Sequence, residues 1–161
     1  MIHEALPDLG PIAARAITEV LATQLNLPTR ESALVEWPIA GQPEQSLIGS
    51  VKLTGSRVSG DVHVQLPDGF VAKVTGLLLG RTAADAEEAA DITGELCNML
   101  AGRVAADLAA AGYSSILSTP KVSRGRRLEP EIAPGAQTCR SDWISGGHLL
   151  TVMLQIIFRS I

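Results

Sequence analysis

Alternate residues near the end of the chain are apolar without interruption, and this pattern restricts the possible folds more than any other. Because successive side chains of a β-strand point to opposite faces, a strand here would place one apolar row against a core. The row consists of Leu150, Val152, Leu154, Ile156 and Phe158. The same period of two returns in residues 47–53 and 62–66. We therefore expect a hairpin and a final strand in a sheet that is covered on one face.

Apolar residues at helical spacing predict helices over residues 12–27, 69–79 and 83–111. The first stretch lies between Pro11 and Pro28, and the third is followed by Gly112, which are residues typical of helix boundaries. The first helix is amphipathic, the second is short and apolar, and the third is long and rich in alanine. These segments supply the long helices that could cover the sheet.

Further strands are predicted over residues 113–117 and on both sides of Gly146 and Gly147, and residues 38–45 are predicted to form a loop. The resulting order of helices and strands is typical of an α+β fold. We expect a two-layer arrangement, with a mostly antiparallel sheet and long helices packed on one face.

The length and composition predict one domain. The chain has 161 residues, of which 46% are hydrophobic, so it can bury a substantial core without a metal or a disulfide. We expect residues 1–161 to form this single domain. Because only 3% of the residues are aromatic, the core must be largely aliphatic, with a few isolated large fillers. These are Trp37, Trp143, Phe70 and Phe158.

The charge and hydropathy exclude several classes of partner. A net charge of −4 argues against nucleic-acid binding, which needs clustered Lys and Arg. The one basic cluster, at residues 124–127, is expected to be a solvated loop. No stretch is long and apolar enough to span a bilayer, so we expect no membrane partner and a cytoplasmic location. Cys97 and Cys139 are expected to be reduced thiols without a chemical role.

The sequence contains no recognisable nucleophile or metal motif. His3, His63 and His148 are scattered, and His63 is expected on the polar, exposed side of its strand. Neither His-x-x-x-His nor paired Cys-x-x-Cys occurs. We therefore predict no metal site and no cofactor in this chain, and a self-contained hydrolase is not expected.

One polar stripe stands out on the long predicted helix. At about 100° per residue, Asp91, Glu95, Asn98 and Gly102 lie within roughly 60° of one another. On spacing alone, the solvated face of an amphipathic helix is the favoured interpretation of Asp91, Glu95 and Asn98. Gly94 and Gly102 each cost about 1 kcal/mol relative to Ala in a helix interior. Such glycines suit either the close approach of a partner or packing within the chain.

The spacing Asp91-x-x-x-Glu95-x-x-Asn98, followed by Pro120, resembles the signature of the CheC, CheX and FliY phosphatases of bacterial chemotaxis. The strings GELCNMLAGRVAADL and ILSTPKVSRG resemble the CheX version of the phosphatase helix and of the strand after it. The resemblance covers about residues 46–125 and includes one copy of the signature, as in CheX. Many CheX relatives carry GNAK after the motif, where this chain has a basic residue in a shifted place, Arg103.

The resemblance implies a CheC/CheX-like fold and a phosphatase that acts on the aspartyl phosphate of a CheY-like receiver domain. It implies that Asn98 positions the attacking water and that Glu95 pairs with the active-site Lys of the receiver, which also carries Mg²⁺. Further candidate partner-binding residues are Asp91, Gly94, Gly102 and Pro120. For Asp91, a solvated helix acid remains an equal alternative.

Two other functions remain open on the sequence alone. The first is a non-catalytic receiver-binding or flagellar-switch-like adaptor of the same fold, and the second is an unrelated small-molecule or metal enzyme. The sequence does not identify the receiver or the pathway. A homodimer is also expected, from the resemblance and because the final strand could offer an edge to a second copy.

Overall fold

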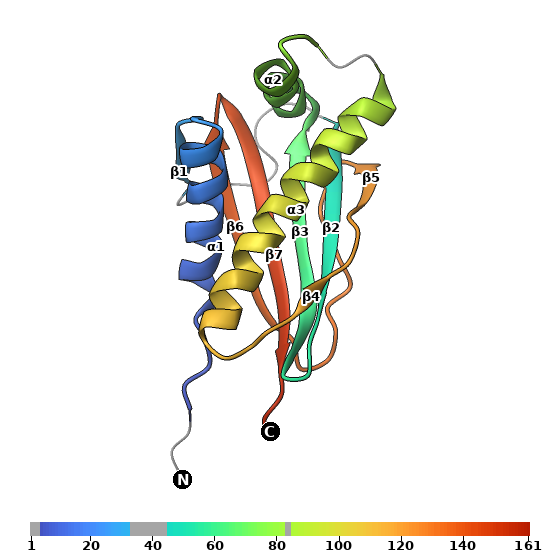
Figure 1. Cartoon of the computed structure of the whole chain (residues 1–161). Coiled ribbons are helices and arrows are strands. Elements are labelled where there is room, and N and C mark those ends of the chain that lie inside the picture. The colour runs from blue at the N-terminus through green and yellow to red at the C-terminus, as the bar shows by residue number, and fades with distance from the viewer. Residues whose placement is uncertain (1–3, 33–44, 83–84) are drawn as a thin grey trace.

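The computed structural model describes residues 4–32, 45–82 and 85–161 (Figure 1). Trp37, His3 and most of the predicted loop 38–45 lie outside these residues. The helical elements are α1 (Leu9–Ile17), the π-helical η1 (Thr18–Gln24), α2 (Asp68–Leu79) and α3 (Ala86–Ala110). The strands are β1 (Thr29–Glu31), β2 (Ser46–Thr54), β3 (Val58–Pro67), β4 (Ile116–Leu117), β5 (Lys121–Gly125), β6 (Gln137–Ser145) and β7 (His148–Phe158).

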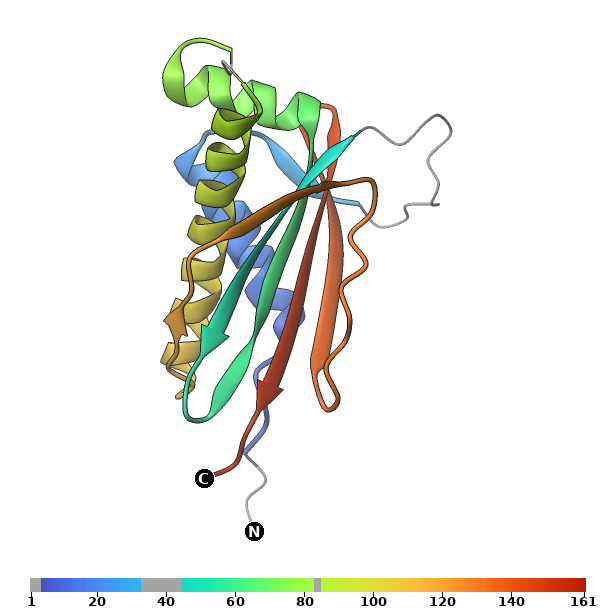
Figure 2. The same cartoon turned by 90° about the vertical axis from the view of Figure 1, so that its right-hand side faces the viewer.

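The strands form one antiparallel sheet, and the long helices pack on one of its faces. The strand order is β1-β6-β7-β3-β2-β4, and β5 also pairs with β2. α1 and α3 lie across the same face, while α2 crosses one end of the sheet (Figures 1 and 2). This arrangement confirms the predicted α+β class, the antiparallel sheet and the layer of helices on one side.

The apolar row of β7 lies in the core, as predicted. Leu150, Val152, Leu154 and Ile156 are all buried in one cluster with residues of α1, α3, β2 and β3. However, β7 pairs with β3 on one side and with β6 on the other. The expectation that the final strand offers a free edge is therefore wrong. The alternation shows which face of a strand is buried, but pairing depends on segments far away in the sequence.

The first helix differs from its prediction in both position and type. It begins at Leu9, where the Asp8 side chain accepts a hydrogen bond from the backbone of Gly10 at 3.1 Å. From Thr18 to Gln24 the chain widens into a π-helix, which ends when Leu25 N–H donates to the carbonyl of Val20 at 3.1 Å. The predicted strand 113–117 is also shorter, because only Ile116–Leu117 pairs with β2.

The face of the sheet opposite the helices is covered by residues 126–136, which we call the strap (Figure 2). Two buried glutamines bind its backbone. Gln65 donates to the carbonyl of Arg126 at 3.1 Å and accepts from Leu128 N–H at 2.7 Å. Gln155 donates to the carbonyl of Glu131 at 3.1 Å. These contacts hold the strap on an otherwise polar surface.

The structure corrects two expectations about the polar residues in and around this face of the sheet. The basic cluster is not simply a solvated loop, since Arg124 lies in β5 and binds both carboxylate oxygens of Asp68, at 3.1 and 3.0 Å. His63 is not a surface residue, because only 9% of it is exposed. Its Nδ1 lies 2.7 Å from Ser50 Oγ. The polar side of β3 was expected to face solvent, but a segment distant in the sequence covers it.

Candidate functional site

Helix α3 sets the orientation of the predicted stripe. Asp85 caps its first turn by accepting from Glu88 N–H at 2.9 Å. Leu96, Leu100 and Val104 are buried, which fixes the rotation of the helix on the sheet. The opposite face must then point outward. Asp91, Glu95 and Asn98 are all exposed there, as the spacing predicted.

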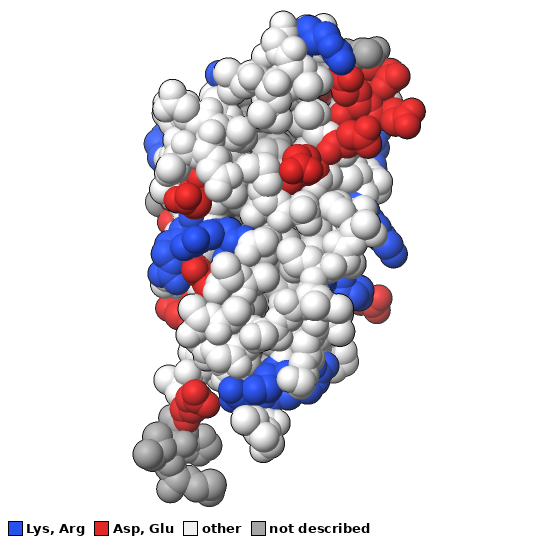
Figure 3. Space-filling model, in the orientation of Figure 1, with Lys and Arg blue, Asp and Glu red and all other residues white. Residues whose placement is uncertain are grey.

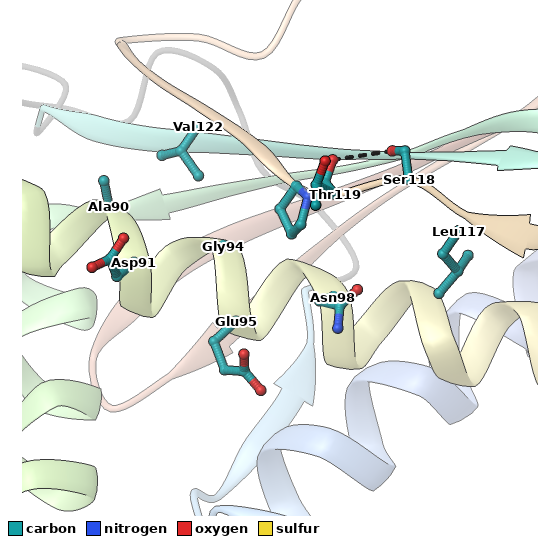
Figure 4. A pocket seen from close by; sticks show the side chains of 10 residues that line it. Ala90, Asp91, Gly94, Glu95, Asn98, Leu117, Ser118, Thr119 and Val122 are labelled. Carbon is teal, nitrogen blue, oxygen red and sulfur yellow. Dashed lines mark hydrogen bonds between the residues drawn. The ribbon is translucent and has the colours of Figure 1, made fainter.

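A groove of about 670 Å³ runs between α3 and the segment from β4 to β5 (Figure 4). It is lined by Ala90, Asp91, Gly94, Glu95, Asn98, Leu117, Ser118, Thr119, Pro120 and Val122. Five of the six predicted site residues therefore meet at one place, although Pro120 is far from the others in sequence. The sixth, Gly102, does not line the groove.

The two helix glycines have different surroundings. A Cβ atom on Gly94 would lie 3.5 Å from Pro120 Cβ and 3.6 Å from Val122 Cγ2, which are ordinary contact distances. Gly94 thus faces its own chain, and packing within the chain accounts for its position. A Cβ atom on Gly102 would have no neighbour within 4 Å among the described residues. Its side of the helix is open to solvent.

Pro120 lies at the outer edge of the sheet, between β4 and β5. Just before it, Ser118 N–H donates to the carbonyl of Lys52 at 2.9 Å, and Lys52 N–H donates to Ser118 Oγ at 2.9 Å. A proline is tolerated at such an edge because its missing N–H is not needed for pairing. Pro120 packs against Gly94 and forms part of one wall of the groove.

Sequence reasoning missed the groove residues Leu117, Ser118 and Thr119. They form the wall opposite Asn98, and their position follows from the pairing of β4 and β5 with β2. A leucine and two short polar residues before a proline give no local sign of such a role. Only the resemblance, which extends over ILSTPKVSRG, could have pointed to them.

Acidic side chains gather over the N-terminal part of α3 (Figure 3). Glu88 forms two hydrogen bonds with Arg81, at 2.7 and 2.8 Å. Among the described residues, no ion pair involves Glu87, Asp91 or Glu95, which follow one another at intervals of four. Like charges at this spacing repel one another. This stretch of helix is therefore suited to a cationic partner surface.

The shifted basic residue does not belong to the stripe. Arg103 pairs with Asp107 one turn later on the helix, at 3.4 Å. The stripe itself offers one amide, which can both donate and accept hydrogen bonds, and carboxylates, which accept them. Such groups can hold a water or a cation. They do not form a covalent intermediate without an organised base beside them.

The thiols and possible metal ligands lie elsewhere. Burial raises the pKa of the Cys97 thiol to about 12, and Cys139, also a free thiol, is partly buried. Within residues 4–32, 45–82 and 85–161, no three His, Cys, Asp or Glu side chains lie close enough to bind a metal. None of the helices in these ranges is long and apolar enough to cross a membrane.

Comparison with known proteins supports the fold strongly. The CheC-like superfamily protein from Shewanella sp. PV-4 is 20% identical, with a TM-score of 0.74 over 94% of this chain and 99% of that one. CheX from Vibrio vulnificus is 18% identical, with a TM-score of 0.78 over 95% and 99%. The CheX–CheY–BeF₃–Mg complex from Borrelia burgdorferi matches at 18% identity and a TM-score of 0.63, also over 95% and 99%.

These structural similarities confirm the CheC/CheX-like fold that the sequence resemblance implies. No curated protein matches the sequence. Residues 47–138, more than half of the chain, match the family described as "Chemotaxis phosphatase CheX". This match includes the hairpin except for its first residue, Ser46, and the whole of α2, α3 and the groove. The chain belongs to the CheX family of chemotaxis phosphatases.

Proposed function

We propose that this protein hydrolyses the aspartyl phosphate of a CheY-like receiver domain. The observation that carries the proposal is the exposed pair Glu95 and Asn98 on one rigid helix, at the rim of a groove closed by Pro120. A helix holds two side chains at a fixed separation better than a loop does. Membership of the CheX family supports the same reaction class.

In this mechanism Asn98 enters the active site of the receiver and holds a water in line with the phosphorus. The water oxygen attacks the phosphorus, the bond to the aspartyl oxygen breaks, and the carboxylate of the receiver leaves. The receiver supplies Mg²⁺ and a Lys, which stabilise charge on the phosphoryl oxygens. Asn98 therefore needs only to orient the water, and the acceleration arises from positioning.

Glu95 serves to fix the docking by pairing with the active-site Lys of the receiver. Its position, one turn before Asn98 and exposed, allows both side chains to reach the same partner. Asp91 extends the acidic surface by a further turn and is proposed as a partner contact. Gly94 and Pro120 shape the groove, while the open surface at Gly102 leaves room for the partner.

We also propose that the protein forms a homodimer. The final strand cannot supply the interface, since it is paired on both sides. Among the described strands, β1 pairs only with β6, and β4 and β5 pair only with β2, so the outer edges of the sheet are the candidates. Light scattering over a concentration series tests this. A monomer at every concentration would refute the homodimer proposal but not the proposed phosphatase activity.

The test of the proposed function is loss of radiolabelled phosphoryl group from each receiver of the host, with and without the protein. At least one receiver should lose its label faster in its presence. The alternative, an adaptor without catalysis, predicts binding without turnover. Titration calorimetry separates the two, because a phosphatase should bind the beryllofluoride-activated receiver more tightly than the inactive one. Equal affinity without turnover would identify an adaptor.

A further inference from the structure

The last turn of α2 exposes an apolar surface that the fold does not use. Leu77, Leu78 and Leu79 are 56%, 45% and 44% exposed, and together we call them the leucine end. The first half of α2 is anchored, since Phe70 and Val74 are fully buried. Single exposed leucines are common on proteins, but here three consecutive leucines, spread over about 200° of the helix circumference, leave the last turn of α2 apolar on most of its surface.

The local structure explains why this turn leaves the core. Gly80 ends the helix in the left-handed conformation, with φ of 68°, and its N–H donates to the carbonyl of Gly76 at 3.0 Å. A Cβ atom on Gly76 would meet no described atom within 4 Å. The helix therefore extends past the layer it packs on. The leucines are displayed on a well-formed helix end.

The leucine end lies near the N-terminal end of α3, the helix that carries the proposed site. α2 starts above the sheet and extends to the side of the molecule on which α3 lies (Figures 1 and 2). α2 packs against α3, and the two hydrogen bonds from Arg81 to Glu88 tie the chain just after α2 to the first turns of α3. A protein that docks on the outer face of α3 would meet both elements.

We infer that the leucine end is the apolar part of the surface that docks the receiver, an inference that rests on the proposed function. The acidic stretch Glu87, Asp91 and Glu95 continues from the leucine end to Asn98 and carries charges unpaired within the described chain. The combination fits a partner with an apolar patch beside a row of basic side chains. Burial of apolar side chains supplies affinity, while the charges supply orientation and association rate.

The separation of docking by the leucine end from catalysis by Asn98 can be detected in KM and kcat. The leucine end is remote from the reacting phosphorus, so it binds the receiver equally in the ground state and in the transition state. Its loss should raise KM and leave kcat unchanged. Removal of the Asn98 side chain should instead lower kcat and leave KM nearly unchanged. The two measurements therefore separate the docking surface from the catalytic one.

The experiment compares wild type with the double variant Leu77→Gln/Leu78→Gln. Glutamine keeps a helix propensity close to that of leucine, so α2 should persist. The matched control is Ile132→Gln, because Ile132 is 56% exposed, as Leu77 is, but lies on the strap. The double variant should weaken binding to the beryllofluoride-activated receiver about tenfold or more. The control should bind as wild type does, and circular dichroism verifies the fold of each variant.

Three outcomes would overturn the inference. If the double variant binds and turns over the receiver as wild type does, the leucine end is not part of the docking surface, although the phosphatase proposal stands. If light scattering shows that the double variant has lost self-association instead, a second copy of this chain is the occupant. If wild type neither binds nor dephosphorylates any receiver of the host, the proposed function fails as well.

Discussion

Replacement of Asn98 by alanine should lower activity while slightly raising stability. The side chain is exposed, and no hydrogen bond to another described residue involves it. It lies in the interior of α3, where alanine is favoured over asparagine by up to about 0.7 kcal/mol. For a chain of this size, that gain corresponds to a rise in Tm of up to about 3 °C. No cavity forms, because nothing in the core is removed.

The expected effect on activity is a loss, and it is much larger than the small gain in stability. Removal of one preorganised polar group from a reaction site lowers kcat by about 10²- to 10³-fold. Here the lost group would be the amide that orients the water. Since Glu95 would still dock the receiver, the affinity for the beryllofluoride-activated receiver should change little. The combination of a higher Tm, an unchanged Kd and a low kcat is specific to the proposed role.

The assay follows loss of radiolabelled phosphoryl group under saturating and limiting protein. Gln137→Ala, which removes an exposed amide from β6, is the matched control and should have wild-type activity. Glu95→Ala should be rescued in part by a higher protein concentration, whereas Asn98→Ala should not. The double variant should be less impaired than the product of the two single effects. Full activity in Asn98→Ala, or a loss of activity that follows a fall in Tm, would refute the reasoning.

Other predictions concern the rest of the fold. Gln65→Ala should lower the free energy of unfolding by about 1–3 kcal/mol in urea denaturation, since it leaves strap backbone groups unpaired; no change would show that the strap is not held there. Burial lowers the pKa of His63, with a weaker opposing effect of Asp61, so the unfolded chain binds more protons. Wild-type stability should therefore fall as pH drops below about 6.5, and a His63→Gln variant should lose that part of the dependence. A thiol reagent at pH 8 should modify Cys139 in the folded protein but reach Cys97 only after unfolding; modification of both at equal rates would contradict the burial of Cys97.

The local periodicities of the sequence were sufficient for the hairpin, β7, α2, α3 and the orientation of the stripe, but not for β1, β5 or the π-helical η1. Period two in β7 and the three- and four-residue spacing in α3 depend only on the geometry of a strand and a helix, so the buried and exposed faces followed directly. The chemistry assigned to the stripe required the family resemblance, because spacing alone favours a solvated helix face.

Tertiary structure decided everything that depends on distant segments. It paired β7 on both sides, buried His63, bound the strap to Gln65 and brought Pro120 to Gly94. The tertiary structure also leaves the end of α2 exposed, outside the core. Strand neighbours and loop contacts are selected by the packing of the whole chain, and a local pattern contains no record of which segment will lie opposite. The sequence therefore determined the faces of the elements, and the fold determined what each face meets.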